Sequence, residues 1–239
     1  MTKVFLPALL LLGGAARQFA TDAAILDDPR AKNYTQRLET QVNLPKMVEG
    51  GLDAAFFIVY VGQGPLTPEG YDAAYKQAVA KFDAVHHLTK EIAPGQIELA
   101  LTAADVTRIA KSGKKVALIG IENAYPLGTD IKRVKEFHDR GGRYISLAHN
   151  GHSQFADSNT GERDGKWLHN GLSELGKQVI AEANKWGLMI DLSHPSKAAN
   201  LQALALSKRR PWLASTLVTS AWRGALGSPM GPGMVRTSV

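Results

Sequence analysis

The sequence predicts an α/β fold of the parallel-barrel type, with about five or six strand–helix units. Apolar, β-branched runs alternate with segments of helical periodicity, which is the pattern of a parallel sheet covered by helices. Three of the apolar runs also lead to a side chain that can bind a metal, namely Glu122, His149 and His194. Because the carboxyl ends of parallel strands share one mouth of a barrel, we expect these three side chains to meet there.

The first strand is expected at 54–61, where the run AAFFIVYV is apolar without interruption, as in a strand buried on both faces. Shorter runs of the same kind predict the later strands, at 115–122, 143–149, 188–194 and 211–214.

The first helix is expected to begin at Pro68 and to extend to about Lys90, because proline suits a first helical turn and apolar residues recur along one stripe. Thr102 and Asp105 have the spacing of a capping box, and Gly113 suits the end of the helix that they begin. The same periodicity predicts further helices at 130–140, 172–186 and 195–207. The polar segment 150–170 is too long for a plain connection, so we expect it to be functional or partly mobile.

The two ends of the chain differ from the middle. Lys3, the apolar stretch 4–12 and the small residues after it predict a signal peptide over residues 1–16, with a buried first helix as the alternative. A signal peptide predicts an exported protein, periplasmic or extracellular, with membrane association left open.

Residues 17–215 are expected to form a partial barrel domain. Glycine and proline cluster from Thr216 onward, so residues 216–239 are predicted to be an irregular tail, either translated out of frame or naturally divergent.

Composition narrows the classes of function and of binding site. The formal net charge is +6, but basic residues such as Lys76, Lys81 and Lys111 are scattered and expected on polar helix faces. No basic cluster interleaves with aromatic residues, so nucleic-acid binding is not expected. The chain contains no cysteine, so any metal must be held by His, Asp or Glu. No segment offers the roughly 20 apolar residues that a membrane-spanning helix needs.

Short motifs accompany the predicted strands in a fixed order. They are QVNLPKMVEGG at 41–51, IGIE at 119–122, RYISLAHN at 143–150, ADS at 156–158, GLSELG at 171–176 and IDLSH at 190–194. Taken together, the motifs resemble the membrane dipeptidase (renal dipeptidase) family of zinc metallopeptidases. The resemblance extends from about residue 41 to residue 215.

This resemblance implies a (β/α)8 barrel with two zinc ions, which hydrolyses dipeptides, including those with a C-terminal D-residue. By position, Glu122 corresponds to the carboxylate that bridges both zinc ions, and His194 to a ligand of one of them. His149 corresponds to the substrate-side histidine that steadies the developing oxyanion. Arg223 is the nearest match to an arginine that holds the substrate carboxylate. The resemblance also allows a homodimer.

The chain departs from the family pattern at three places. The first family strand ends in a His-x-Asp pair that binds zinc, whereas no histidine precedes His86 here. A family Ser-His-Ser motif, which supplies a further zinc ligand, is replaced by Ala-Ser-Thr at 214–216. A late family aspartate that contacts the substrate amine has no counterpart. Two interpretations therefore stay open: a zinc dipeptidase with impaired activity, or an inactive remnant with at most weak peptide binding. A third interpretation, with less support, is an unrelated barrel hydrolase with a single metal.

Other polar residues near the predicted site are expected to serve structure. His152 and His169 lie in the long loop and are expected at the surface. Asp157 either lines the site or forms a cap or turn. Strand alternation places Asp191 on the opposite face from His194, which favours a structural role for Asp191.

Overall fold

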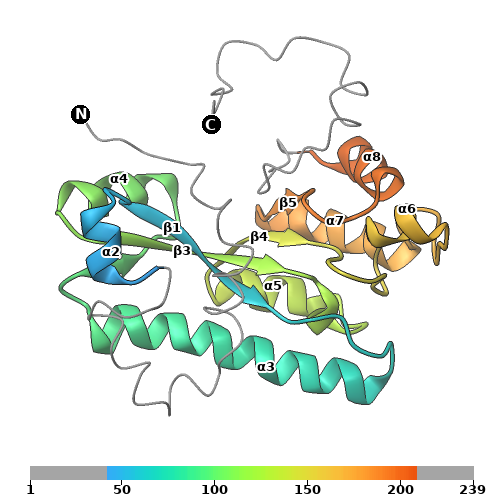
Figure 1. Cartoon of the computed structure of the whole chain (residues 1–239), viewed down its shortest axis with the longest axis horizontal. Helices are drawn as coiled ribbons and strands as arrows, with labels where there is room; N and C mark the ends of the chain where they lie inside the picture. Colours follow the sequence, from blue (N-terminus) through green and yellow to red (C-terminus); the bar gives the residue numbers. More distant parts are fainter. Residues whose placement is uncertain (1–41, 209–239) are drawn as a thin grey trace, which may run out of the picture.

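The structure is a computed structural model of the 239-residue chain, and it describes residues 42–208. Within these residues, parallel strands form one sheet in the order β1-β3-β4-β5, and β2 also pairs with β3 (Figure 1). The strands are β1 (Ala54–Tyr60), β2 (Ile97–Leu99), β3 (Lys115–Glu122), β4 (Gly142–Ser146) and β5 (Met189–Asp191). All the pairings are parallel, so the predicted α/β class is confirmed.

Helices follow the strands along the chain. They are α2 (Leu44–Glu49), α3 (Pro68–His87), α4 (Ala103–Lys111), α5 (Lys132–Asp139), α6 (Thr160–Asp164), α7 (Glu174–Trp186) and α8 (Lys197–Leu206), with a π-helical turn η4 (Leu88–Ile92) and a 3₁₀ turn η5 (Tyr125–Leu127). The predicted capping box is confirmed, because Thr102 accepts a hydrogen bond from the backbone of Asp105 and the Asp105 side chain accepts one from Thr102. The short elements α2, β2 and α6 were not predicted, because each has too few residues to show a period.

The two faces of the sheet have different neighbours. Side chains such as Phe57, Ile119 and Ile145 belong to one apolar cluster with residues of α3, α5 and α7. Burying an aliphatic or aromatic side chain of this kind stabilises the fold by about 1.5–3 kcal/mol. Alternate residues point the other way, and Tyr60 pairs in register with Glu122 at the carboxyl ends of β1 and β3. Tyr60 and Glu122 therefore lie at one end of the sheet and on the face opposite to this cluster.

The strands β4 and β5 end three residues earlier than predicted. The prediction placed His149 and His194 at strand ends, but β4 ends at Ser146 and β5 ends at Asp191. The chain turns after β5, where Asp191 accepts hydrogen bonds from the backbone and the hydroxyl of Ser193. The alternation argument for Asp191 was therefore wrong, because the strand does not continue to His194. Asp191 pairs in register with Ser146 on β4.

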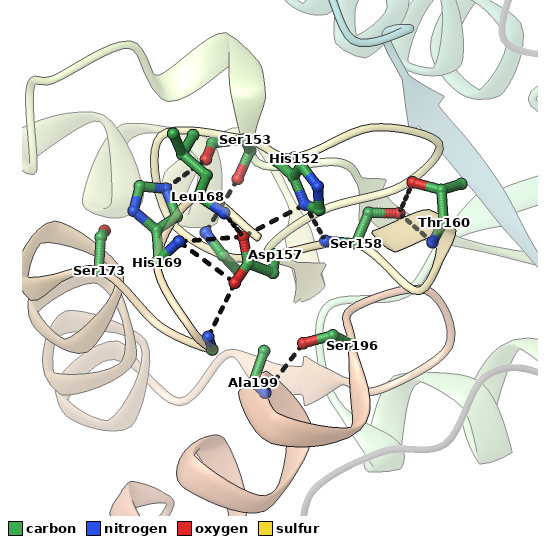
Figure 2. A network of polar contacts seen from close by, with 12 residues as sticks. His152, Ser153, Asp157, Ser158, Thr160, Leu168, His169, Ser173, Ser196 and Ala199 are labelled. Carbon is green, nitrogen blue, oxygen red and sulfur yellow. Dashed lines mark hydrogen bonds and ion pairs between the residues drawn. The ribbon is translucent and has the colours of Figure 1, made fainter. Parts of the chain in front are cut away.

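The loop 150–170 is folded around the carboxylate of Asp157, which is fully buried (Figure 2). This carboxylate accepts hydrogen bonds from the backbone of Leu168 and Gly171, which are 11 and 14 residues further along the chain, so it anchors the loop instead of forming a local cap or turn. His152 and His169 are partly exposed, and each also makes a hydrogen bond within the loop. His152 Nδ1 accepts from the backbone of Ser158, and His169 Nε2 contacts the carbonyl oxygen of Ser153.

Lys81 was expected on a polar helix face, but only 6% of it is exposed. Its Nζ donates a hydrogen bond to the carbonyl oxygen of Tyr60, so the lysine connects α3 to the end of β1. This position explains the burial, because a buried ammonium group needs a hydrogen-bond acceptor.

Several predictions lie outside the described residues: the signal peptide at 1–16, the strand at 211–214, Arg223, and the tail at 216–239. Within residues 42–208, no helix combines the length and the apolar character needed to cross a bilayer.

Candidate metal centre

The structure brings together the three residues that the sequence singled out. Glu122 Oε1 lies 2.9 Å from His194 Nε2 and 3.3 Å from His149 Nε2. One potential ligand atom from each residue falls within 4.8 Å of the others. In the part of the chain that the structure describes, this is the one group of three or more such residues with metal-binding geometry.

The parallel sheet explains why residues so far apart in sequence meet. Glu122 is the last residue of β3, and β4 pairs directly with β3. β5 pairs with β4 in turn, so the segments that follow β4 and β5 leave the sheet at the same end. His149 and His194 each stand three residues beyond their strand. Both therefore reach the carboxylate at the end of β3.

The electrostatics of the site favour an ionised Glu122. Burial raises the pKa of its carboxyl, but hydrogen bonds and charge interactions with His149 and His194 outweigh burial and lower the pKa from 4.5 to about 2. The carboxylate is therefore available as an anionic ligand throughout the neutral range.

The donor set fits a divalent metal. Two zinc ligands that each lie about 2.0–2.1 Å from the ion in a tetrahedral arrangement are about 3.3 Å apart. The distances from Glu122 to the two histidines are 2.9 and 3.3 Å, which is close to this value. The carboxylate of Glu122 and the imidazole of His194 are both ligand types of catalytic zinc, and the imidazole of His149 lies beside them.

Tyr60 is a neighbour of the site that the sequence analysis missed. Its hydroxyl lies 3.4 Å from His149 Nδ1, and the two ring centroids are 4.7 Å apart. Tyr60 lies one residue before the end of the run AAFFIVYV and pairs in register with Glu122, but an aromatic residue in such a run is equally typical of the core, so the sequence does not single it out. The Tyr60 ring and hydroxyl leave His149 Nε2 directed toward Glu122.

Comparison with known proteins supports the architecture. A sequence model of the membrane dipeptidase family (peptidase family M19) matches residues 15–221. Dipeptidase tcpJ of Claviceps purpurea (strain 20.1) is 33% identical over 177 residues, which cover 72% of this chain and 41% of that protein. Dipeptidase 3 of Mus musculus is 30% identical over 184 residues, which cover 77% of this chain and 35% of the mouse protein. The chain thus spans less than half the length of these relatives.

Solved structures agree with this result. The probable dipeptidase PvdM from Pseudomonas aeruginosa superposes with a TM-score of 0.66 at 28% identity, over 73% of this chain and 45% of that chain. A metallo peptidase from Rhodobacter sphaeroides, solved with a phosphinate mimic of the dipeptide L-Ala-D-Ala, has a TM-score of 0.64 at 23% identity, over 80% and 62% of the two chains. The second likeness concerns the fold alone. From the sequence match and the fold together, the chain belongs to the membrane dipeptidase family of metallopeptidases.

Proposed function

We propose that this chain is a zinc-dependent dipeptidase whose metal is held by Glu122 and His194. The observation that carries the proposal is the contact of both site histidines with one carboxylate oxygen at the end of β3. The substrate class follows from the relatives, which are named as dipeptidases. Dipeptides with a C-terminal D-residue are included because the sequence motifs resemble those of the membrane dipeptidase family. Two zinc ions are expected for the family.

The chain's own residues have separable tasks in this reaction. When bound, zinc polarises the scissile carbonyl and lowers the pKa of a coordinated water. Glu122 supplies negative charge to hold the cation, and its low pKa means that protons do not compete for the carboxylate at neutral pH. His149 presents Nε2 to the same space, from which it can donate a hydrogen bond to the oxygen that becomes negative in the tetrahedral intermediate.

The task of His149 can be separated from that of a ligand. If His149 acts on the substrate, His149→Ala keeps its zinc and loses turnover by about 100-fold or more, the usual effect of removing one oxyanion donor. His194→Ala is the matched variant, which loses zinc and activity together. The measurements are zinc content and kcat for each purified variant. Loss of zinc from His149→Ala would make His149 a ligand and contradict its proposed role.

The activity itself is tested by hydrolysis of L-Ala-D-Ala and L-Ala-L-Ala, with zinc added and after its removal by a chelator. We expect zinc-dependent release of free alanine by the wild-type chain and none by Glu122→Gln. Glu98→Gln is the control, because Glu98 lies on β2 and forms its ion pairs with Arg108 of α4 and with Lys114, which precedes β3. Equal hydrolysis by both variants would trace the activity to a contaminant.

A second function is favoured by one sequence observation. All seven histidines lie between positions 86 and 194, so the family's His-x-Asp pair is absent from this sequence. A chain with fewer ligands than its family could bind dipeptides without hydrolysing them. Binding of L-Ala-D-Ala by calorimetry, with no alanine released, would support this function over the first.

We also propose, from the composition of residues 1–16, that the protein is exported. The expected result is a mature chain about 16 residues shorter in the periplasm or the culture medium. A homodimer is proposed from the family resemblance alone, and the mass of the purified protein in solution tests it.

A further inference from the structure

Residues 157–159, which we call the strut, bond to the backbone of both site histidines. The hydroxyl of Ser158 donates a hydrogen bond to the carbonyl oxygen of His149. The backbone N–H of Asn159 donates to the carbonyl oxygen of His194 at 2.9 Å. Ser158 also forms a short antiparallel bridge with Pro195. The strut therefore spans the gap between the two segments that carry the histidines.

This connection matters because neither histidine belongs to a strand. β4 ends at Ser146 and β5 ends at Asp191, so the ladder of the sheet does not fix the backbone at positions 149 and 194. Hydrogen bonds from the strut act on the backbone at both of these positions. A shift of the strut would change the distance between the two imidazoles, whose ring centroids are 4.0 Å apart.

The strut is itself held by Asp157. The buried carboxylate accepts hydrogen bonds from the backbone N–H of Leu168 at 2.8 Å, of Gly171 at 2.9 Å and of His169 at 3.1 Å (Figure 2). The carbonyl oxygen of Asp157 accepts a further bond from the backbone of Ser196 at 2.7 Å. Bonds to a buried charged group are costly to break, so the strut has a defined position.

Ser158 is the link between this anchored segment and His149. The whole residue is fully buried. Its hydroxyl donates to the carbonyl oxygen of His149 and accepts from the backbone of Thr160 at 3.2 Å. The hydroxyl is therefore fixed on both sides, and its donor proton is directed at a residue of the site.

We propose that Ser158 is a positioning residue of the metal centre, which sets His149 against His194 and Glu122 through the strut. This inference rests on the proposed function for the task of His149. Groups that orient the residues of a metal centre from outside typically change activity by about 10–100-fold when they are replaced.

Ser153 provides a matched control in the same loop. It is also fully buried, and its hydroxyl donates to the carbonyl oxygen of Leu147 at 2.6 Å and accepts from the backbone of Phe155 at 3.1 Å. The two serines thus make the same types of bond. Only Ser158 bonds to one of the three residues of the centre.

The experiment compares Ser158→Ala and Ser153→Ala by two readouts. The first is kcat for hydrolysis of L-Ala-D-Ala, with the zinc content of each variant measured beside it. The second is the ¹³C–¹H NMR signals of the histidine rings in metal-free protein, assigned with His149→Ala and His194→Ala. We expect Ser158→Ala to keep its zinc, to lower kcat by about 10–100-fold, and to shift the signals of His149 and His194. Ser153→Ala should leave both readouts close to those of the wild type.

Equal effects of the two variants, or wild-type kcat and signals in Ser158→Ala, would overturn the proposal. The NMR readout separates it from the proposed function. A wild-type chain that binds no zinc, but whose His149 and His194 signals shift in Ser158→Ala alone, would refute the zinc site and uphold the strut. Ser158→Cys, which keeps the size of the side chain but donates weakly, replaces Ser158→Ala if circular dichroism shows the latter to be unfolded.

Discussion

At the scale of single residues, Glu122 is the residue that connects the two histidines of the candidate centre. Its Oε1 contacts both histidines, and its lowered pKa is caused by those same contacts. The sequence could predict this residue, because a carboxylate that directly follows a buried apolar run in a parallel sheet faces the common end of the strands. It could not predict Tyr60, since an aromatic residue within such a run is equally typical of the core.

Tyr144 shows how burial beside the site affects a second titratable group. It is 1% exposed, and burial raises the pKa of its phenol well above 10, with the charges of Asp191 and Glu122 adding to the effect. A group whose pKa is raised in the folded state contributes stability below its ordinary pKa and loses it as the pH rises. The folded protein should therefore become less stable above pH 10.

We accordingly predict that the wild type loses more unfolding free energy between pH 8 and pH 11 than Tyr144→Phe. The measurement is urea denaturation at both pH values. Tyr71→Phe serves as the control, because burial raises the pKa of that phenol to a lesser degree. Parallel losses in the wild type and in Tyr144→Phe would show that Tyr144 ionises as freely in the folded state as in the unfolded chain.

At the scale of elements, accuracy of prediction followed the length of the apolar run. The prediction of β3 matched the observed bounds, and that of β1 was one residue too long. The ends of β4 and β5 were misplaced, because the residues after Ser146 remain apolar although the chain has left the sheet. The fold of the loop 150–170 could not be predicted, since the partners of Asp157 stand 11 to 14 residues away.

Gly120 lies where β3 packs against β4, and the space at this position admits no larger side chain. A methyl group at this position would approach the ring of Tyr144 to 2.2 Å, which is far inside van der Waals contact. We predict that Gly120→Ala destabilises the protein by about 1–3 kcal/mol or more, the usual cost of overpacking a core. The measurement is the free energy of unfolding in urea.

Gly95→Ala is the matched control for this variant. No atom lies within 4 Å of a methyl group at that position, and its backbone conformation suits any residue. Its effect should fall within about 0.5 kcal/mol, as is usual for surface changes. Similar unfolding free energies for both variants would mean that β4 does not pack on β3 in this register.

At the scale of the whole molecule, the site depends on the order of the strands. Four adjacent strands contribute to it: β1 brings Tyr60, β3 brings Glu122, and the segments after β4 and β5 bring the two histidines. Sequence motifs could identify the residues, but their convergence required the parallel order β1-β3-β4-β5. The loop anchored by Asp157 then bonds to the two segments that extend beyond the sheet.

The central claim is that these strands bring Glu122 and the two histidines together in a site that binds metal. The zinc content per folded chain tests this claim most directly. We predict at least one equivalent of zinc retained after dialysis by the wild type, and none by Glu122→Gln or His194→Ala, while all three proteins show the same circular dichroism. A folded wild-type chain without zinc, or zinc retained unchanged in both variants, would contradict the claim.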